Sequence, residues 1–189
     1  DLPKPSNYKT QELNELLPLQ QVFGYTQEDV RITLEPMART AYEPTGSMGN
    51  DTPLAVLSNE NTLLFNYFKQ LFAQVSNPPL DAIREELITS LSATIGAEQN
   101  LFDETEDHCK QLRLPIPIIS NQQLAQISEL NSDSLNSQKI STLFEPSIGS
   151  LQSTLEKIFD ETSTAVNQGK TIIILSDRGV DKNHVPIPS

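Results

Sequence analysis

The sequence predicts an α/β fold, with parallel strands in the C-terminal half and a mostly helical N-terminal half. Apolar side chains recur every three or four residues over 62–76, which is the period of an amphipathic helix. Residues 116–175 alternate short apolar runs with helical patterns, which is typical of parallel strands joined by helices. The long helical pattern over 148–168 ends at Gly169, and glycine favours the position just after a helix.

The chain is predicted to start with a linker and a short helix. Residues 1–7 contain Pro3 and Pro5 and are expected to be extended. Residues 10–17 have a helical pattern, and we expect Pro18 to interrupt it because proline has no amide hydrogen to donate.

A second helix is predicted between Thr26 and Met37. Thr26 is a good N-cap, because its side-chain oxygen can accept a hydrogen bond from the first turn. Glu28 and Asp29 add negative charge where the helix dipole favours it. Pro36 is a candidate kink within this helix.

The middle of the chain mixes irregular and regular segments. Residues 43–53 contain two glycines and two prolines and are expected to be irregular. The apolar run 54–58 follows, and then the helix over 62–76. A helical turn over 80–87, strands over 88–95 and 116–119, and a short acidic helix over 103–112 complete this part.

The C-terminal part has the clearest alternation. We predict a helix over 121–130, a mobile polar loop over 132–138, and strands over 140–144 and 171–175. The helix over 148–168 separates these two strands and has one apolar side, formed by Leu151, Leu155, Ile158, Phe159 and Val166.

Composition excludes several classes of partner. The formal net charge is −12, with 13 Lys and Arg and no basic cluster, so we expect no nucleic acid and no membrane partner. Cys109 is the one cysteine, which rules out an intrachain disulfide and favours a reducing compartment, the bacterial cytoplasm or the plastid stroma. The chain begins at Asp1 and ends soon after an apolar strand, so we expect it to be an internal part of a larger enzyme.

No catalytic, cofactor or metal site is predicted. Cys109 follows His108, but adjacent helical residues point about 100° apart and acidic neighbours disfavour the thiolate, so a structural cysteine is expected. The acidic residues 103–108 lack the ligand spacing of zinc or calcium sites.

Two other segments have both a plain and a functional interpretation. Asp177 and Arg178 follow a buried strand, at the edge where α/β proteins usually bind ligands. We favour a structural turn there, with Asp177 capping backbone amides and pairing with Arg178 or another cation. The glycine-containing loop from Ser47 to Pro53 is either a plain loop or a contact surface.

Four segments, in order, resemble the central domain of the glutamate synthase large chain. They are Gly24-Tyr-Thr-Gln-Glu-Asp-Val30, Ser47-Met-Gly-Asn-Asp-Thr-Pro-Leu-Ala-Val-Leu-Ser58, Asn77-Pro-Pro-Leu-Asp-Ala-Ile-Arg-Glu-Glu-Leu87 and Ile173-Ile-Leu-Ser-Asp-Arg-Gly-Val180. The overall similarity is to the ferredoxin-dependent kind of cyanobacteria and plastids. The resemblance implies that residues 1–189 are this central domain, truncated at its C-terminal end.

The resemblance also implies a function. The family enzyme converts glutamine and 2-oxoglutarate into two glutamates, with reduced ferredoxin or NAD(P)H as electron donor. An amidotransferase domain releases ammonia, and a domain with FMN and an iron–sulfur cluster reduces the intermediate. The central domain links the two, helps to wall the ammonia tunnel, and is an incomplete, rudimentary barrel. These two domains are therefore the expected partners, with ferredoxin as a partner of the parent enzyme.

The resemblance carries no catalytic residue onto this chain, which we expect to be inactive by itself. For a contact with the tunnel or between domains, the candidates are Met37, Ser47, Met48, Asn50, Asp51, Thr52 and Pro53. Two alternatives remain: an enzyme with a site at Asp177 and Arg178, and an acidic protein-interaction module at Asp103–Asp107.

Overall fold

The computed structural model describes residues 2–6, 8, 12–40, 53, 55–59, 67–68 and 82–187. The chain divides into two compact units. The N-terminal unit is Gln11–Thr89, and the C-terminal unit combines Asp1–Thr10 with Ser90–Ser189. The chain therefore leaves the C-terminal unit after its first ten residues and returns to it at Ser90.

The N-terminal unit is helical in its described parts. Its elements are α1 (Leu13–Val22), the π-helical segment η1 (Asp29–Leu34), α2 (Glu35–Thr40) and α3 (Ala82–Ile88). For the described residues, the mostly helical N-terminal half and the helical turn predicted near 80–87 are thereby confirmed.

Pro18 lies inside α1, so the expected interruption is wrong. The helix starts three residues later than predicted, at Leu13, and continues past the proline to Val22. Pro18 has no amide hydrogen, so the helix lacks only the hydrogen bond to the Asn14 carbonyl. Helical hydrogen bonds resume beyond it, where the Phe23 amide donates to the Leu19 carbonyl at 3.0 Å.

Thr26 caps the next helix as predicted. Its hydroxyl oxygen accepts from the Asp29 amide at 3.1 Å, and the Asp29 carboxylate accepts from the Thr26 amide at 2.8 Å. The backbone is then π-helical, with the Glu35 amide donating to the carbonyl of Val30. The π-helical segment ends at Leu34, and the α-helix α2 begins at Glu35, one residue before Pro36.

Two predicted segments of this unit fall largely outside the described residues. Of the helix over 62–76, only Tyr67 and Phe68 are described, and both are exposed. The apolar run 54–58 is described from Ala55 onward. There the Ser58 amide donates to the Ala55 carbonyl at 3.0 Å, which closes a turn.

The C-terminal unit begins with an antiparallel pair. Strand β1 (Ala93–Ile95) pairs with β2 (Leu112–Leu114). The strand predicted over 116–119 is wrong, because Pro115 and Pro117 lack the amide hydrogens of a sheet ladder and the strand ends before them. The acidic helix predicted over 103–112 is reduced to one 3₁₀ turn, η3 (Glu106–Cys109), since β2 takes the following residues.

A parallel pair forms the centre of this unit. Strand β3 (Ser137–Ser141) pairs with β5 (Ile172–Ser176), and α5 (Leu151–Asn167) connects them. One parallel pair and the long helix are thus confirmed. The strand predicted over 140–144 is divided between β3 and a separate strand over Leu143–Phe144. Strand β3 begins inside the predicted mobile loop, because the buried Ser137 hydroxyl donates to the Ser128 carbonyl at 2.9 Å.

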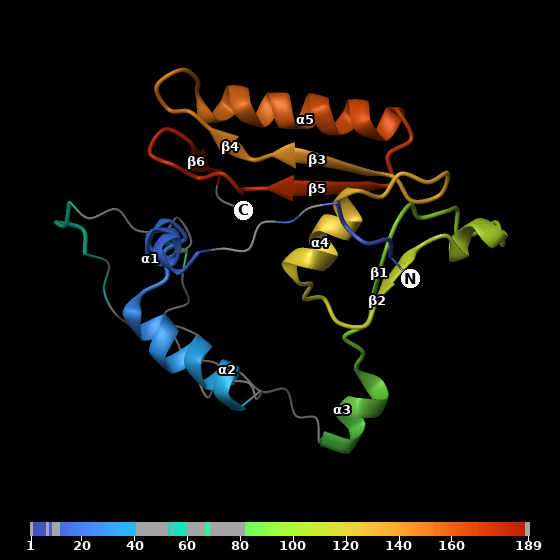
Figure 1. Cartoon of the computed structure of the whole chain (residues 1–189), viewed down its shortest axis with the longest axis horizontal. Coiled ribbons are helices and arrows are strands. Elements are labelled where there is room, and N and C mark those ends of the chain that lie inside the picture. Colours follow the sequence, from blue (N-terminus) through green and yellow to red (C-terminus); the bar gives the residue numbers. More distant parts are fainter. Residues whose placement is uncertain are drawn as a thin grey trace. The chain divides into compact units, whose positions relative to one another are not determined.

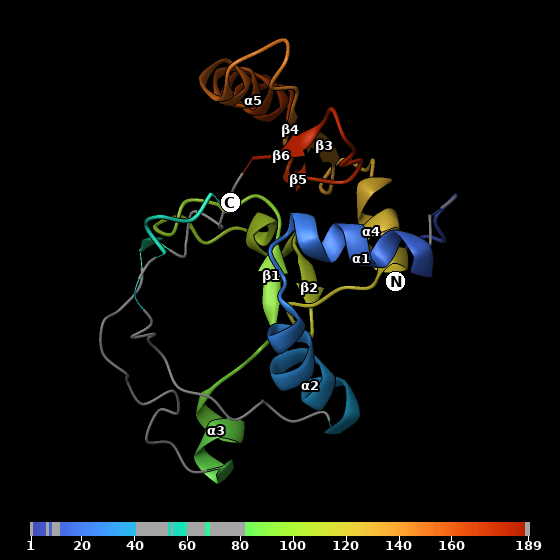
Figure 2. The same ribbon diagram turned by 90° about the vertical axis from the view of Figure 1, so that its left-hand side faces the viewer.

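The helix α4 (Asn121–Ser128) begins where predicted and ends two residues earlier, and α5 begins three residues later and ends one residue earlier than predicted. Each starts with a reciprocal capping box, Ser120 with Gln123 and Ser150 with Ser153. Gly169 follows α5 with a φ of 84°, a left-handed conformation that glycine adopts without strain. Figures 1 and 2 show α4 and α5 on opposite sides of the β3–β5 pair.

A third pair completes the described strands. Strand β4 (Leu143–Phe144) pairs antiparallel with β6 (Val185–Pro186). The described strands thus form three two-stranded pairs and no closed barrel. The fold is mixed α/β with one parallel pair, and the barrel-like arrangement that the resemblance implied stays a proposal.

The described core lies in the C-terminal unit and contains Leu114, Ile127, Ile140, Ile158, Ala165 and Ile172. On α5, the predicted apolar side is buried only in part. Ile158 and Ala165 are buried, whereas Phe159 is 63% and Val166 55% exposed. The helix packs against β3, so the side chains that face this strand are buried. Side chains on the other sides of the helix are exposed to solvent.

Candidate functional site

The carboxyl end of the β3–β5 pair is where an α/β fold would place a ligand site. Ser141 and Ser176 are register partners at this end, and Ser176 is buried. The Thr142 amide donates to the Ser176 carbonyl at 2.9 Å, so the chain stays bonded beyond the last pair of the ladder. The predicted residues Asp177 and Arg178 come directly after it, and both are exposed.

Arg178 connects this strand end to the start of α4. Its guanidinium Nη2 donates to the Asn121 side-chain oxygen at 2.7 Å, and its amide donates to the Ser176 hydroxyl at 3.4 Å. Within the part of the chain that the structure describes, Arg178 forms no ion pair with Asp177. The Arg178–Asn121 contact joins residues 57 apart, so no local spacing could have predicted it.

A tight turn follows at Asp181–His184. The Asp181 carboxylate accepts from the amides of Asn183 at 2.8 Å and His184 at 2.9 Å, and it contacts the His184 ring at 2.9 Å. The Asn183 amide, followed by the bonds from His184, holds the pKa of Asp181 below its ordinary value. An Asp followed by three polar or charged residues is a signal for such a turn, and the sequence analysis missed it.

The ring of His184 also approaches Glu145, with 4.0 Å between Nε2 and the nearer carboxylate oxygen. This histidine therefore lies between two carboxylates, and no hydroxyl or thiol of the described residues bonds to it. A nucleophile beside a base is the arrangement that covalent catalysis needs. The contacts described at this edge bind the chain to itself. The structural turn at Asp177 and Arg178 stays a prediction.

Two of the candidate residues for a tunnel or interdomain contact lie among the described residues. Met37 lies on α2 and is 44% exposed, and Pro53 is exposed. The other candidates, Ser47, Met48, Asn50, Asp51 and Thr52, lie outside the described residues. Their role as contact residues stays a prediction.

The acidic segment near Cys109 is locally bonded. Lys110 forms an ion pair with Asp107 at 2.6 Å, and this lysine lowers the pKa of the Asp107 carboxyl. The His108 ring contacts the Asp103 carbonyl at 2.8 Å, and Cys109 is exposed. Among the described residues, no group of three or more His, Cys, Asp or Glu is placed to hold a metal ion.

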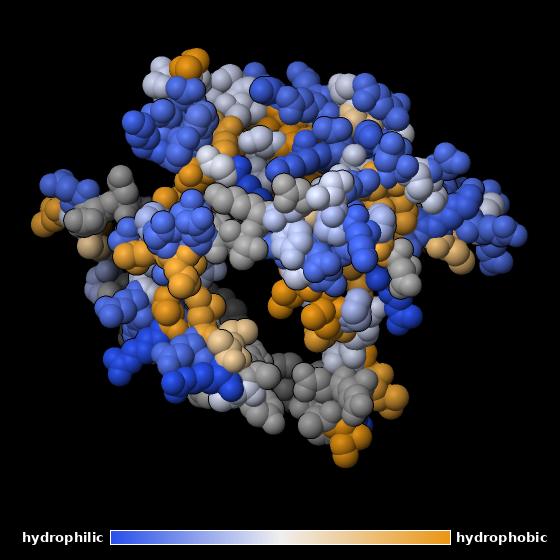
Figure 3. Space-filling view, in the orientation of Figure 1, coloured by the Kyte–Doolittle hydropathy of each residue, from blue (hydrophilic) through white to orange (hydrophobic). Residues whose placement is uncertain are grey.

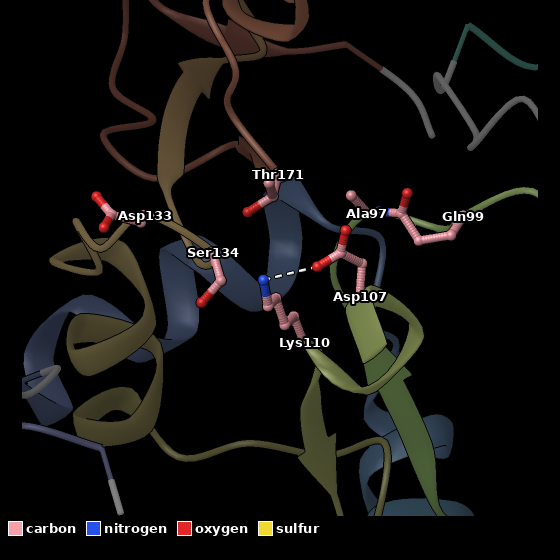
Figure 4. Close-up of a pocket in the computed structure, with 7 residues that line it drawn as sticks. All are labelled: Ala97, Gln99, Asp107, Lys110, Asp133, Ser134 and Thr171. Carbon is pink, nitrogen blue, oxygen red and sulfur yellow. Dashed lines mark ion pairs between the residues drawn. The ribbon is translucent and has the colours of Figure 1, made fainter. Parts of the chain in front are cut away.

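An open polar pocket lies beside this segment, with a volume of about 280 Å³. Figure 4 shows the Asp107–Lys110 pair on one wall and Ser134 and Thr171 facing it. Its lining residues are Ala97, Gln99, Asp107, Lys110, Asp133, Ser134 and Thr171. The only cation of this set is already paired with a carboxylate, so the pocket presents no free charge to recognise an anion.

Comparison with known proteins shows the family of this chain. Residues 18–189 match the family model described as the glutamate synthase central domain. The chain belongs to this family. It is 42% identical over 186 residues to the glutamate synthase [NADPH] large chain of Bacillus subtilis, covering 98% of this chain and 12% of that protein.

Other relatives use different electron donors, according to their names. The glutamate synthase [NADH] of Schizosaccharomyces pombe is 40% identical over 171 residues, which are 88% of this chain and 8% of that protein. The chloroplastic ferredoxin-dependent glutamate synthase of Oryza sativa is 39% identical over 181 residues, 93% of this chain and 11% of that protein. The chain thus spans about an eighth or less of the length of these relatives, and its likeness does not separate the donor types.

Proposed function

We propose that this chain is the non-catalytic central domain of a glutamate synthase. It connects a glutamine amidotransferase domain to an FMN-binding synthase domain and helps to form the tunnel for ammonia. The parent enzyme makes two glutamates from glutamine and 2-oxoglutarate with reduced ferredoxin or NAD(P)H. The observation that carries this proposal is the family match over residues 18–189.

The exposed apolar side chains of the C-terminal unit support a role within a larger chain. Ile140 and Leu175 are register partners on the same face of the parallel pair, yet Ile140 is 2% and Leu175 60% exposed. Phe159 and Val166 of α5 are also more than half exposed. Apolar surface of this kind is typical of interfaces, and the rest of a parent chain would supply the partner.

The iron–sulfur cluster of the proposed parent does not fit this chain. An iron–sulfur cluster is held by several cysteine thiolates, and Cys109 is the single cysteine of the sequence. We therefore place FMN and the cluster in other parts of the parent chain. This chain would hold the two catalytic domains in position and take no part in the reaction itself.

The proposal includes a location in the bacterial cytoplasm or the plastid stroma. No helix among the described residues is both long and apolar enough to cross a membrane. Relatives with NADPH, NADH and ferredoxin in their names match at similar identity, so an activity assay of the parent enzyme should supply each donor in turn.

The tunnel role is tested by Asp51→Trp and Thr52→Trp in the full-length protein. A bulky side chain on the tunnel wall should obstruct ammonia. Glutamine hydrolysis should then continue while glutamate formation falls and free ammonia appears. The ratio of glutamate formed to glutamine consumed measures this uncoupling directly.

Glu98→Trp is the matched control, because Glu98 is exposed in the other unit and is not among the candidate contact residues. It should leave the ratio unchanged. A ratio that also stays unchanged in both tunnel variants, with activity retained, would reject the loop as part of the tunnel wall.

A further inference from the structure

The first residues of the chain lie against the end of α4, although they are far from it in sequence. The Ser6 amide donates to both carboxylate oxygens of Glu129, at 3.0 and 2.9 Å, and the Ser6 hydroxyl donates to one of them at 3.0 Å. These two residues are 123 positions apart. The described part of the predicted linker is thus bound to a helix.

A second side chain of α4 binds the same segment. Gln126 Nε2 donates to the Pro3 carbonyl at 2.7 Å and to the Leu2 carbonyl at 3.4 Å. Gln126 and Glu129 are three residues apart and therefore lie on one side of the last turn. One supplies a donor and the other an acceptor, so together they bind both kinds of backbone group in an extended segment.

The chemistry of Glu129 is suited to this contact. It is the C-cap residue of α4, where the negative end of the helix dipole opposes a carboxylate. Amide and hydroxyl donors from Ser6 offset that opposition with charge-assisted hydrogen bonds. Pro3 and Pro5 restrict the segment to extended conformations, which reduces the entropy lost on docking.

Helix α4 is in turn fastened to the parallel pair. At its start, Asn121 accepts from Arg178, which follows β5. At its end, the carbonyl of Ser128 accepts from the Ser137 hydroxyl at the start of β3. The N-terminal segment is therefore tied through α4 to both parallel strands.

We propose that the C-terminal end of α4 is a docking surface for the proline-containing segment through which the chain enters this unit. Gln126 and Glu129 form the surface, and residues 2–6 are its occupant. Residues 11–89 are then an insertion between this docked segment and the rest of its unit. The proposal deepens the proposed function, since it makes the connection to the preceding domain a fixed one.

Amide hydrogen exchange in the full-length protein tests this docking. The Ser6 amide should be protected in the natural sequence. Glu129→Ala should speed its exchange by about 10- to 100-fold, the loss expected for a hydrogen bond to a charged group. Ser6→Ala keeps the amide and should have a smaller effect, and Asp160→Ala, an exposed acid on α5, should have none.

Peptides from residues 121–128 report whether α4 remains folded in each variant. Unchanged exchange there, together with faster exchange at Ser6, supports docking by Glu129. Equal exchange at Ser6 in the natural sequence and in Glu129→Ala overturns the proposal. Neither measurement depends on catalysis, so absence of glutamate synthase activity in the parent would reject the proposed function and leave this result intact.

Discussion

The helices of the two units differ in what their apolar side chains contact. In the C-terminal unit, α4 and α5 both contact β3 and contribute buried residues, Ile127, Ile158 and Ala165, to a core. In the N-terminal unit, α1, η1 and α2 contain no buried residue in the described part of the chain. Figure 3 shows apolar side chains along α1 and the η1–α2 helix on the surface.

This difference shows that a helix can form without being buried. Thr26 and Ser150 cap their helices with the same kind of reciprocal hydrogen bonding. Yet Leu13 in α1 is 89% exposed, whereas Ile158 in α5 is 8% exposed. Local hydrogen bonds can start a helix in either unit, but most helical stability comes from packing of its apolar face.

The largest contrast is expected for matched isoleucines. Ile140→Ala removes a side chain that is 2% exposed and should lower the free energy of unfolding of the C-terminal unit by about 3 kcal/mol, through lost burial and the cavity left behind. Ile32→Ala removes one that is 51% exposed and should cost about 0.5 kcal/mol or less.

Denaturant unfolding, with hydrogen exchange of the β3 and β5 amides to assign the unit, measures both variants. Equal losses would show that the two units do not differ in packing. A large loss for Ile32→Ala would mean that its surface is covered in solution.

A smaller contrast is expected for the two capping residues. Ser150→Ala removes the bond from the Ser153 amide, 3.1 Å long, and should destabilise the C-terminal unit by about 1 kcal/mol. Thr26→Ala removes the equivalent bond from Asp29, also 3.1 Å long. It should speed amide exchange in η1 while the unfolding of the C-terminal unit stays the same. Faster exchange in β3 or β5 after Thr26→Ala would contradict this separation.

The smallest expected effect is that of lowering the pH, to which one carboxylate in each unit should respond alike. Asp181 and Asp29 both have pKa values below the ordinary 3.8, lowered chiefly by the Asn183 amide and by Thr26. Because each folded pKa is depressed, each local contact is complete above about pH 4. It is lost as the pH falls through the folded value.

Carboxyl chemical shifts in an NMR titration should therefore give midpoints below 3.8 for both residues. Asp181→Asn should remove the acid-dependent change in the amide shift of His184, while Asp29 titrates as before. A midpoint at or above 3.8 for Asp181 would mean that its turn is not formed in solution.

The elements that local sequence predicted well are those with their own start and stop signals. The helices near 121–130 and 148–168 were located by their helical patterns, and the second also by Gly169, which follows it. The structure adds that Ser120 and Ser150 cap them. Prediction failed where two local signals competed. The acidic run after Asp103 gave way to a 3₁₀ turn and to β2, because Leu112–Leu114 gains a complete ladder with β1.

The candidate sites show the same division. The position of Asp177 and Arg178 at a strand end was predictable from the apolar run before them, and the structure places them there. Their partners were not predictable, because Arg178 binds Asn121 across 57 residues. The Asp181 turn depends only on bonds to near neighbours, so the local sequence is enough to predict it.

By itself, the sequence determined the family, the capped helices and the parallel strands that flank α5. These depend on the order of residues and on hydrogen bonds between near neighbours. Only the tertiary structure decided that Ser6 binds Glu129, that β3 begins at a buried Ser137, and that α5 buries Ile158 but exposes Phe159. The physical reason is that burial and long-range hydrogen bonds depend on which surfaces pack together. Local periodicity shows that one face of an element is apolar, but it does not show which other element packs against that face.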